Sequence, residues 1–344
     1  MKRLLVLAAV LFAALSCRPK AEEYPMFWTW LEDIPSVDVE AAFAHMEEAG
    51  LDAVMLHAAS VEDYVKDVEL AREHGIKVYA WVWTLNPPRQ ERPQMLQEHP
   101  DWVIRDEEGR PFSCGCNWGG FYGLDIDIPE CLKYIEDSVK RAVYDWGFDF
   151  LKLDFLYAAA AFGNEKETRA GKMIRAMELI RSWVGDKKIL ACGVPLMPAF
   201  GLADYSRIGC DVGLTWRDRP FLRLTHRERV STVNSILDTI YRRQLDRRAF
   251  GNDPDVFFLR TENLELTERE KDILATVNAL LGSVFLTSDD PLKYTDEQKE
   301  KYAYYRHLTE AENVRLIKRE RMGISYRLDG REQEYVIPEE IVRE

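Results

Sequence analysis

Stretches with the character of β-strands alternate with amphipathic helical stretches along most of this chain. Eight apolar, strand-like segments follow the first two dozen residues, and they lie at 26–31, 53–57, 77–84, 148–154, 188–194, 210–216, 255–260 and 283–287. Strands that alternate with helices form parallel βαβ units, and eight such units close a barrel. The sequence therefore predicts an α/β fold, specifically a (β/α)8 TIM barrel.

The two ends of the chain depart from this repeating pattern. The first 17 residues have a basic start and an apolar run too short to span a membrane, which is typical of a signal peptide. They end in Ala14-Leu15-Ser16-Cys17, which resembles the lipobox of bacterial lipoproteins, although an ordinary secretory signal remains an alternative. Near the other end, Asp329-Gly330 lies between two alternating runs, which is a hairpin signal.

These features divide the chain into four parts. We expect a lipoprotein signal peptide ending at a lipidated Cys17 (1–17), a polar tether (18–24), the barrel (25–312) and a small C-terminal β-hairpin appendage (313–344). The lipid would hold the protein in a bacterial cell envelope, facing the periplasm or the cell surface, and would be its sole contact with the membrane.

Charge and cysteine content exclude several kinds of partner. The chain has 46 basic and 59 acidic residues, a net charge of −13, which argues against a nucleic-acid partner. Apart from Cys17 there are five cysteines, and they lack the spacing of metal ligands, so no metal and no cofactor is expected. A disulfide between Cys192 and Cys210 stays open.

The fourth strand carries the most unusual polar pair. Lys152 and Asp154 end an otherwise apolar segment, and a period of two places both side chains on one face. One interpretation is a buried ion pair, or an aspartate that caps the next helix. The other is a catalytic carboxylate at the mouth of the barrel.

Polar and aromatic side chains also end the other strands, and in this fold the strand ends build the active site. They are Trp28, Trp30, His57, Trp81, Trp83, Cys192, Asp211 with nearby Arg207, Arg260, Asp289 and Asp290. Two carboxylates among aromatic walls suit glycoside cleavage, in which one attacks the sugar and the other donates a proton. Alternatives stay open: Asp211 as a cap, His57 and the tryptophans as packing, Asp253 and Asp255 as turn residues, and Asp289 and Asp290 as caps or partners of arginine.

Several stretches resemble the melibiase-type α-galactosidases of glycoside hydrolase clan D. Residues 147–155 (GFDFLKLDF) look like their nucleophile strand, and three pieces at 192–196, 201–202 and 207–212 look like their acid/base segment. Four further pieces fall in the family's order, namely 98–102 (EHPDW), 124–127 (LDID), 252–255 (NDPD) with Arg260, and 288–290 (SDD). The match covers most of residues 75–290.

The resemblance implies roles for individual residues. Asp154 would be the nucleophile and Asp211 the general acid/base, while Lys152 and Arg207 would hold sugar hydroxyls. Arg207 is expected to point at the substrate rather than at Asp211, since a cation would oppose protonation of that acid. Further sugar contacts are expected from Trp81, Trp83, His57, Cys192, Trp28, Trp30, Asp253 and Arg260.

One departure from the family concerns the sugar. The acidic pair that grips the axial hydroxyl of galactose is replaced by His57-Ala58-Ala59-Ser60. The resemblance therefore implies a retaining, exo-acting α-glycosidase, with an α-galactoside as the leading substrate among α-linked oligosaccharides or glycans. Alternatives are an α-N-acetylgalactosaminidase or a transglycosylase on the same barrel, or a lipoprotein that binds glycans without cutting them.

Overall fold

The computed structural model describes residues 25–28, 39–48, 50–51, 53–56, 61–87, 92–114, 122–224, 229–290, 293–318 and 320–342. Trp30, His57 and Cys17 lie outside these residues, as does the side chain of Trp28. Within the described part, no helix has the length and apolar character needed to cross a membrane.

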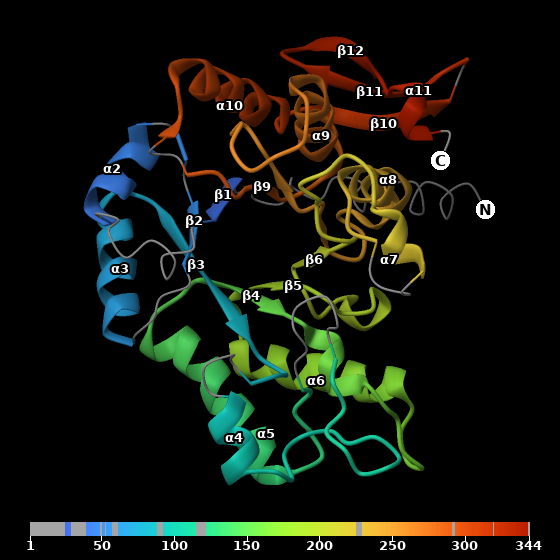
Figure 1. Ribbon diagram of the computed structural model, residues 1–344. Helices are drawn as coiled ribbons and strands as arrows, with labels where there is room; N and C mark the ends of the chain where they lie inside the picture. Colours follow the sequence, from blue (N-terminus) through green and yellow to red (C-terminus); the bar gives the residue numbers. More distant parts are fainter. Residues whose placement is uncertain are drawn as a thin grey trace, which may run out of the picture.

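Parallel strands form the centre of the molecule and helices surround them (Figure 1). The strands are β1 (Pro25–Trp28), β2 (Ala53–Leu56), β3 (Lys77–Trp83), β4 (Phe150–Asp154), β5 (Lys188–Ala191), β6 (Tyr205–Arg207), β7 (Gly251–Asp253), β8 (Val256–Phe257) and β9 (Phe285–Thr287). They are hydrogen-bonded in the order β7-β6-β5-β4-β3-β2-β1-β9-β8, and each pairing is parallel. This is the predicted (β/α)8 TIM barrel.

The seventh strand of the barrel is interrupted. Its two parts, β7 and β8, are the ends of the ladder and do not pair with each other, but only Pro254 and Asp255 separate them. Pro254 has no N–H to donate, and Asp255 has a positive φ of 75°, so the ladder stops there. The amides of Ser283 and Val284 donate to the carbonyl of Asn252, which ties this strand to the chain entering β9.

The longer helices, of 10 to 16 residues, each follow a barrel strand along the chain. They are α2 (Val39–Glu48), α3 (Val61–Glu73), α4 (Arg92–Glu98), α5 (Pro129–Lys140), the π-helical η3 (Arg141–Asp145), α6 (Arg169–Val184), α7 (Pro220–Leu224), α8 (Thr232–Arg242), α9 (Glu268–Leu281), α10 (Asp296–Leu308) and α11 (Glu339–Val342). Short 3-10 turns are η4 (Leu156–Ala160), η5 (Met197–Ala199) and η6 (Arg243–Leu245). The helices α9 and α10 each begin with a capping box, at Thr267 and Thr295.

The C-terminal appendage is a three-stranded antiparallel sheet rather than a single hairpin. Its strands are β10 (Glu312–Lys318), β11 (Met322–Leu328) and β12 (Arg331–Val336), and the sheet lies beside α9 and α10 (Figure 1). The turn between β11 and β12 is Asp329-Gly330, with φ of 50° and 75°, as the hairpin signal predicted.

The sixth strand lies earlier in the chain than we predicted. The prediction of 210–216 is wrong, because β6 is Tyr205–Arg207 and residues 210–216 form bends and irregular loop. The alternating apolar residues of 210–216 resemble a strand, whereas the true strand contains Ser206 and Arg207. Both are buried, since their strand lies within the charged interior described below.

Candidate active site

Strand β4 delivers Lys152 and Asp154 to the carboxyl end of the barrel. All five of its residues are buried, because β3 and β5 flank it and pair Lys152 with Trp81 and Asp154 with Trp83. Lys152 is 1% exposed and Asp154 is 9% exposed. A strand covered on both faces should be apolar, so two ionisable residues at its end mark a site that the fold maintains at a cost.

Two donors fix the carboxylate of Asp154. The indole Nε1 of Trp81 donates to its Oδ2 at 2.9 Å, and the backbone N–H of Phe155 donates to its Oδ1 at 2.8 Å. Phe155 has a φ of 55°, so the chain turns sharply after the strand. The ring centroids of Trp81 and Trp83 are 6.0 Å apart, and those of Trp83 and Phe155 are 5.0 Å apart. Aromatic side chains thus wall and orient the carboxylate.

Cys192 directly follows β5, the strand that lies between β4 and β6 in the barrel. Its thiol is buried and free, so Cys192 and Cys210 do not form a disulfide. Burial, and then the negative charge of Asp154, raise the pKa of Cys192 well above its ordinary value. The charges of Arg207, Lys152 and Asp211 also act on this thiol. The charges of four predicted site residues therefore act on one thiol.

Arg207, the last residue of β6, binds three carboxylates at once. Its Nη1 is 2.8 Å from Asp211 Oδ1, its Nε is 3.1 Å from Asp253 Oδ2, and its Nη2 is 2.6 Å from Asp255 Oδ1. The side chains of Asp253 and Asp255 are 0% and 6% exposed, whereas that of Asp211 is 35% exposed. One guanidinium thus holds two buried acids from the β7–β8 segment and one acid that solvent can reach.

The expectation that Arg207 would turn away from Asp211 is wrong. Two carboxyl groups enclosed beside β7 favour a cation between them, because an uncompensated buried negative charge is strongly unfavourable. The guanidinium lies against them, and its remaining edge reaches Asp211. Arg207 is therefore the centre of an ionic cluster, which we call the Arg207 cluster: Arg207, Asp211, Asp253 and Asp255.

Asp255 is a residue of this cluster that the sequence-based prediction of sugar contacts missed. Burial raises its pKa to about 6, while Arg207 and Lys152 oppose the rise and Asp211 and Asp253 add to it. The backbone N–H of Val212 donates to its Oδ2 at 2.7 Å. A signal was present in the sequence, since two acids flank Pro254 in the segment that pairs with the strand bearing Arg207.

The loop between β3 and α5 is fastened to α6 by a second ionic group. Lys172, with a side chain 7% exposed, lies 2.7 Å from Asp125 and 3.0 Å from Asp127, and Arg175 also bonds Asp127. These contacts hold the 124–127 stretch. They give the two aspartates a structural role.

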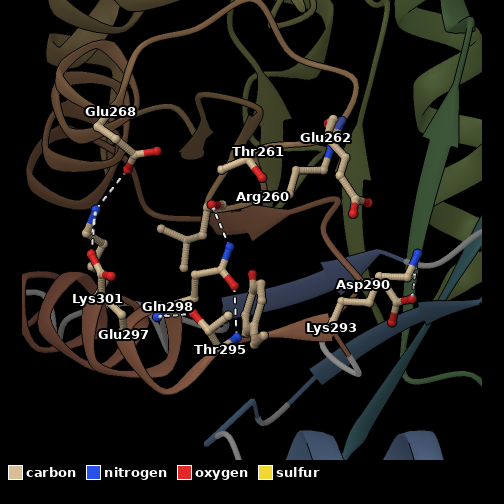
Figure 2. A pocket seen from close by; sticks show the side chains of 12 residues that line it. Arg260, Thr261, Glu262, Glu268, Asp290, Lys293, Thr295, Glu297, Gln298 and Lys301 are labelled. Atoms are coloured by element: carbon tan, nitrogen blue, oxygen red, sulfur yellow. Dashed lines mark hydrogen bonds and ion pairs between the residues drawn. The ribbon is translucent and has the colours of Figure 1, made fainter.

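Arg260 lies at the edge of a separate cavity of about 500 Å³ beyond β8 and β9 (Figure 2). Its Nη1 is 2.9 Å from Oδ1 of buried Asp289, so this acid does pair with an arginine. Around the cavity, Lys301 pairs with Glu268 at 2.9 Å (Figure 2). This pair links α9 to α10, and Lys293 pairs with Asp290 in the loop after β9.

The acids and thiols of the site are not arranged as metal ligands. Across the described ranges, no group of three or more His, Cys, Asp or Glu side chains is arranged to hold a metal ion. The polar groups that meet at the barrel mouth are the carboxylates, Lys152 and Arg207.

Several solved structures are similar to this chain in fold. No family model matches the chain. An α-galactosidase from Thermus thermophilus, solved with p-nitrophenyl α-D-galactopyranoside, matches with a TM-score of 0.73 and 25% identity over 92% of this chain and 67% of that chain. Its complex with stachyose matches with a TM-score of 0.71 and 26% identity over 84% and 66%. The chain spans about two thirds of the length of these Thermus structures.

A more distant match has the same fold. The α-galactosidase I of Mortierella vinacea matches with a TM-score of 0.59 and 15% identity, over 91% of this chain and 80% of that chain. These structural neighbours are α-galactosidases from Thermus and from Mortierella, and the barrel of this chain is similar to theirs.

Proposed function

We propose that this chain is a glycoside hydrolase of the α-galactosidase type, acting as a retaining, exo-acting α-glycosidase on terminal α-linked sugars. The observation that carries the proposal is that β4 ends in Asp154 and that Asp211 lies in the loop after β6, bound to Arg207 at the end of that strand. The two strands flank β5, and the charges of both acids act on the thiol of Cys192, which follows β5. Two carboxylates at one barrel mouth are the minimal equipment of a retaining glycosidase.

The proposed reaction has two steps. A carboxylate oxygen of Asp154 attacks the anomeric carbon, the glycosidic bond breaks, and Asp211 gives its proton to the departing oxygen. Asp211, now a carboxylate, then takes a proton from water as the water oxygen attacks the same carbon and the bond to Asp154 breaks. The sugar leaves with its original configuration, and Asp211 is protonated again.

The contacts of the two acids support this division of labour. Asp154 is held by Trp81 and by the Phe155 amide, so its orientation is fixed as a nucleophile requires. The side chain of Asp211 is 35% exposed, so a leaving group and a water molecule can reach it. Lys152, buried beside Asp154, would hold a sugar hydroxyl.

The substrate is proposed by similarity. The Thermus enzyme was solved with p-nitrophenyl α-D-galactopyranoside and with stachyose, and this favours α-galactosides here. An α-N-acetylgalactosaminidase or a transglycosylase on the same barrel is tested with a panel of aryl α-glycosides and sugar acceptors. The 57–60 segment, outside the described residues, should set the preference among sugars.

The test is hydrolysis of p-nitrophenyl α-D-galactopyranoside and stachyose, with the first-formed anomer followed by proton NMR. We expect Asp154→Asn to abolish release, while Asp149→Asn, an exposed aspartate before β4 paired with Lys187, keeps wild-type activity. For Asp211→Ala, azide should restore release of nitrophenol and yield a glycosyl azide. Full activity in Asp154→Asn would remove the mechanism, and tight binding of stachyose by an inactive wild type would favour the glycan-binding alternative.

We also propose that Cys17 carries a lipid that anchors the protein in a bacterial cell envelope. The Ala14-Leu15-Ser16-Cys17 run supports it. The wild type should take up a labelled fatty acid and sediment with membranes, and Cys17→Ser should do neither. A wild type that takes up no labelled fatty acid, and that sediments with membranes no more than Cys17→Ser does, would contradict the anchor.

A further inference from the structure

The proposed general acid has an unfavourable neighbour. Nη1 of Arg207 lies 2.8 Å from Oδ1 of Asp211, and a cation at that distance favours the ionised carboxylate. A general acid must instead hold a proton when the substrate arrives. With Arg207 alone beside it, Asp211 would be in the wrong state for the first step.

The rest of the Arg207 cluster changes this balance. One guanidinium with three ionised carboxylates has a net charge of 1 − 3 = −2, and two of those carboxylates are almost fully buried. Such a charge in a water-excluded place favours the uptake of a proton by the group of acids. The attraction of Arg207 is therefore divided, and Asp211 is the member that a substrate can reach.

Asp255 makes a second contact that bears on Asp211. Its Oδ1 takes Nη2 of Arg207 at 2.6 Å, and its Oδ2 accepts the backbone N–H of Val212 at 2.7 Å. Val212 directly follows Asp211 in the chain. One buried side chain thus fixes both the cation beside Asp211 and the backbone that carries Asp211.

From these contacts we propose that Asp255, together with Asp253, is a positioning residue that holds Arg207 and offsets its charge, so that Asp211 can keep the proton it donates. This role of Asp255 rests on the proposed role of Asp211. It deepens that role, because it explains how an acid can work against an arginine.

The charged groups that act on Asp255 come from several elements. They are Arg207 of β6, Asp211 of the following loop, Asp253 of β7 and Lys152 of β4. The neighbouring helices contribute neutral contacts: Asn278 of α9 donates to the Asp255 carbonyl, and Ser235 of α8 donates to the Pro254 carbonyl. The proton balance at Asp255 is therefore set within the cluster and by Lys152.

The test removes the charge of Asp255 and follows the pH dependence of kcat/KM. In Asp255→Asn, two carboxylates instead of three oppose Arg207, so Asp211 should lose its proton at lower pH. We expect the basic limb of the profile to move toward acid by about one pH unit. At neutral pH, kcat/KM for stachyose should fall roughly tenfold. The value for p-nitrophenyl α-D-galactopyranoside should fall much less, because nitrophenolate departs without a proton.

Asp253→Asn is the matched variant. It removes the same charge from the same guanidinium but leaves the Val212–Asp255 hydrogen bond, and it should shift the basic limb in the same direction. It also decides the question if Asp255→Asn does not fold. Asp149→Asn should leave the profile unchanged. The charge offset is wrong if the folded variants keep the basic limb of the wild type and if kcat/KM falls by the same factor for both substrates.

A measurement without turnover separates this inference from the proposed function. Carbon-13 NMR of labelled aspartate follows the titration midpoint of Asp211 in the wild type and in the folded variants. An inactive wild type would remove the proposed function, yet a lower midpoint in the variants would still support the coupling. An unchanged midpoint would overturn it.

Discussion

The indole Nε1 of Trp81 donates a hydrogen bond of 2.9 Å to Oδ2 of Asp154, across two neighbouring barrel strands. Trp81 is 6% exposed, so this bond is shielded from water. Trp81 was expected as a sugar platform or as packing. In the structure it is a hydrogen-bond donor that aims the proposed nucleophile.

Replacing Trp81 by phenylalanine keeps an aromatic ring but removes this donor. Because a hydrogen bond to a charged group contributes about 1.5–3 kcal/mol, we expect kcat/KM for aryl α-galactosides to fall roughly tenfold or more. Trp183→Phe, a buried tryptophan of α6, is the control and should keep its activity. An unchanged kcat/KM in Trp81→Phe would show that the Phe155 amide alone orients Asp154.

Asp255 should make the stability of the protein depend on pH. Burial raises the pKa of Asp255 from 3.8 to about 6, so the folded state binds more protons than the unfolded state between these values. Its contribution is therefore most favourable at acid pH and is lost as the pH rises through about 6. Between pH 4 and 7 the wild type should lose about 1–3 kcal/mol relative to Asp255→Asn. Urea unfolding measures this, and parallel curves would contradict it.

Lys172 should be essential to the loop between β3 and α5. Its loss removes the cation 2.7 Å from Asp125 and leaves Asp127 with Arg175 alone, so Lys172→Met should destabilise the fold by about 2–3 kcal/mol. Lys133→Met removes an exposed pair with Asp137 on α5 and should cost less than about 1 kcal/mol. Equal costs in guanidinium unfolding would argue that the Lys172 group is merely superficial.

The contacts of Lys172 and Arg175 should also make the stability of the protein sensitive to acid. Burial raises the pKa of Asp127, but hydrogen bonds from Lys172 and Arg175 outweigh burial and hold this pKa below its ordinary 3.8. This stabilisation is present above pH 4 and is lost as the pH falls through the folded value. Lys172→Met should therefore show a smaller loss of stability on acidification than the wild type.

Gly123 lies where the loop between β3 and α5 passes the chain after Asp154. A Cβ there would be 2.1 Å from the carbonyl oxygen of Ala158 in η4, so Gly123→Ala must displace backbone beside the site. We expect a loss of about 1–3 kcal/mol and a lower kcat. Gly201→Ala meets no atom within 4 Å but has a φ of 72°, and it should cost about 1 kcal/mol without affecting kcat. Normal kcat in a folded Gly123→Ala would contradict the coupling of this loop to the site.

The fold could be predicted because the alternation of eight strand-like segments with helical segments is typical of a (β/α)8 barrel. The regular alternation up to 287 gave the barrel, and Asp329-Gly330 gave a turn of the appendage. The sixth strand was misplaced because Tyr205–Arg207 is only three residues long and two of them are polar. A short strand that ends in buried charge lacks the apolar pattern by which strands are recognised.

The candidate site was predictable residue by residue but not in its pairing. Lys152, Asp154, Arg207 and Asp211 could be named from strand ends and from family resemblance. That Arg207 lies against Asp211 could not, since it depends on the packing of β7 against β6. Asp255 was considered as a turn residue or as a contact at the rim of the site, because nothing in a linear sequence tells how deeply a turn is buried.

Pro254 gives the interruption of the seventh strand a further meaning. Alternate residues of an unbroken strand project in parallel from the same face, each toward a partner of its own. At Pro254 the strand is instead interrupted, and Asp253 and Asp255 both contact the guanidinium of Arg207. The regular strand pairing of the barrel is thus given up at the point where two buried carboxylates meet one guanidinium.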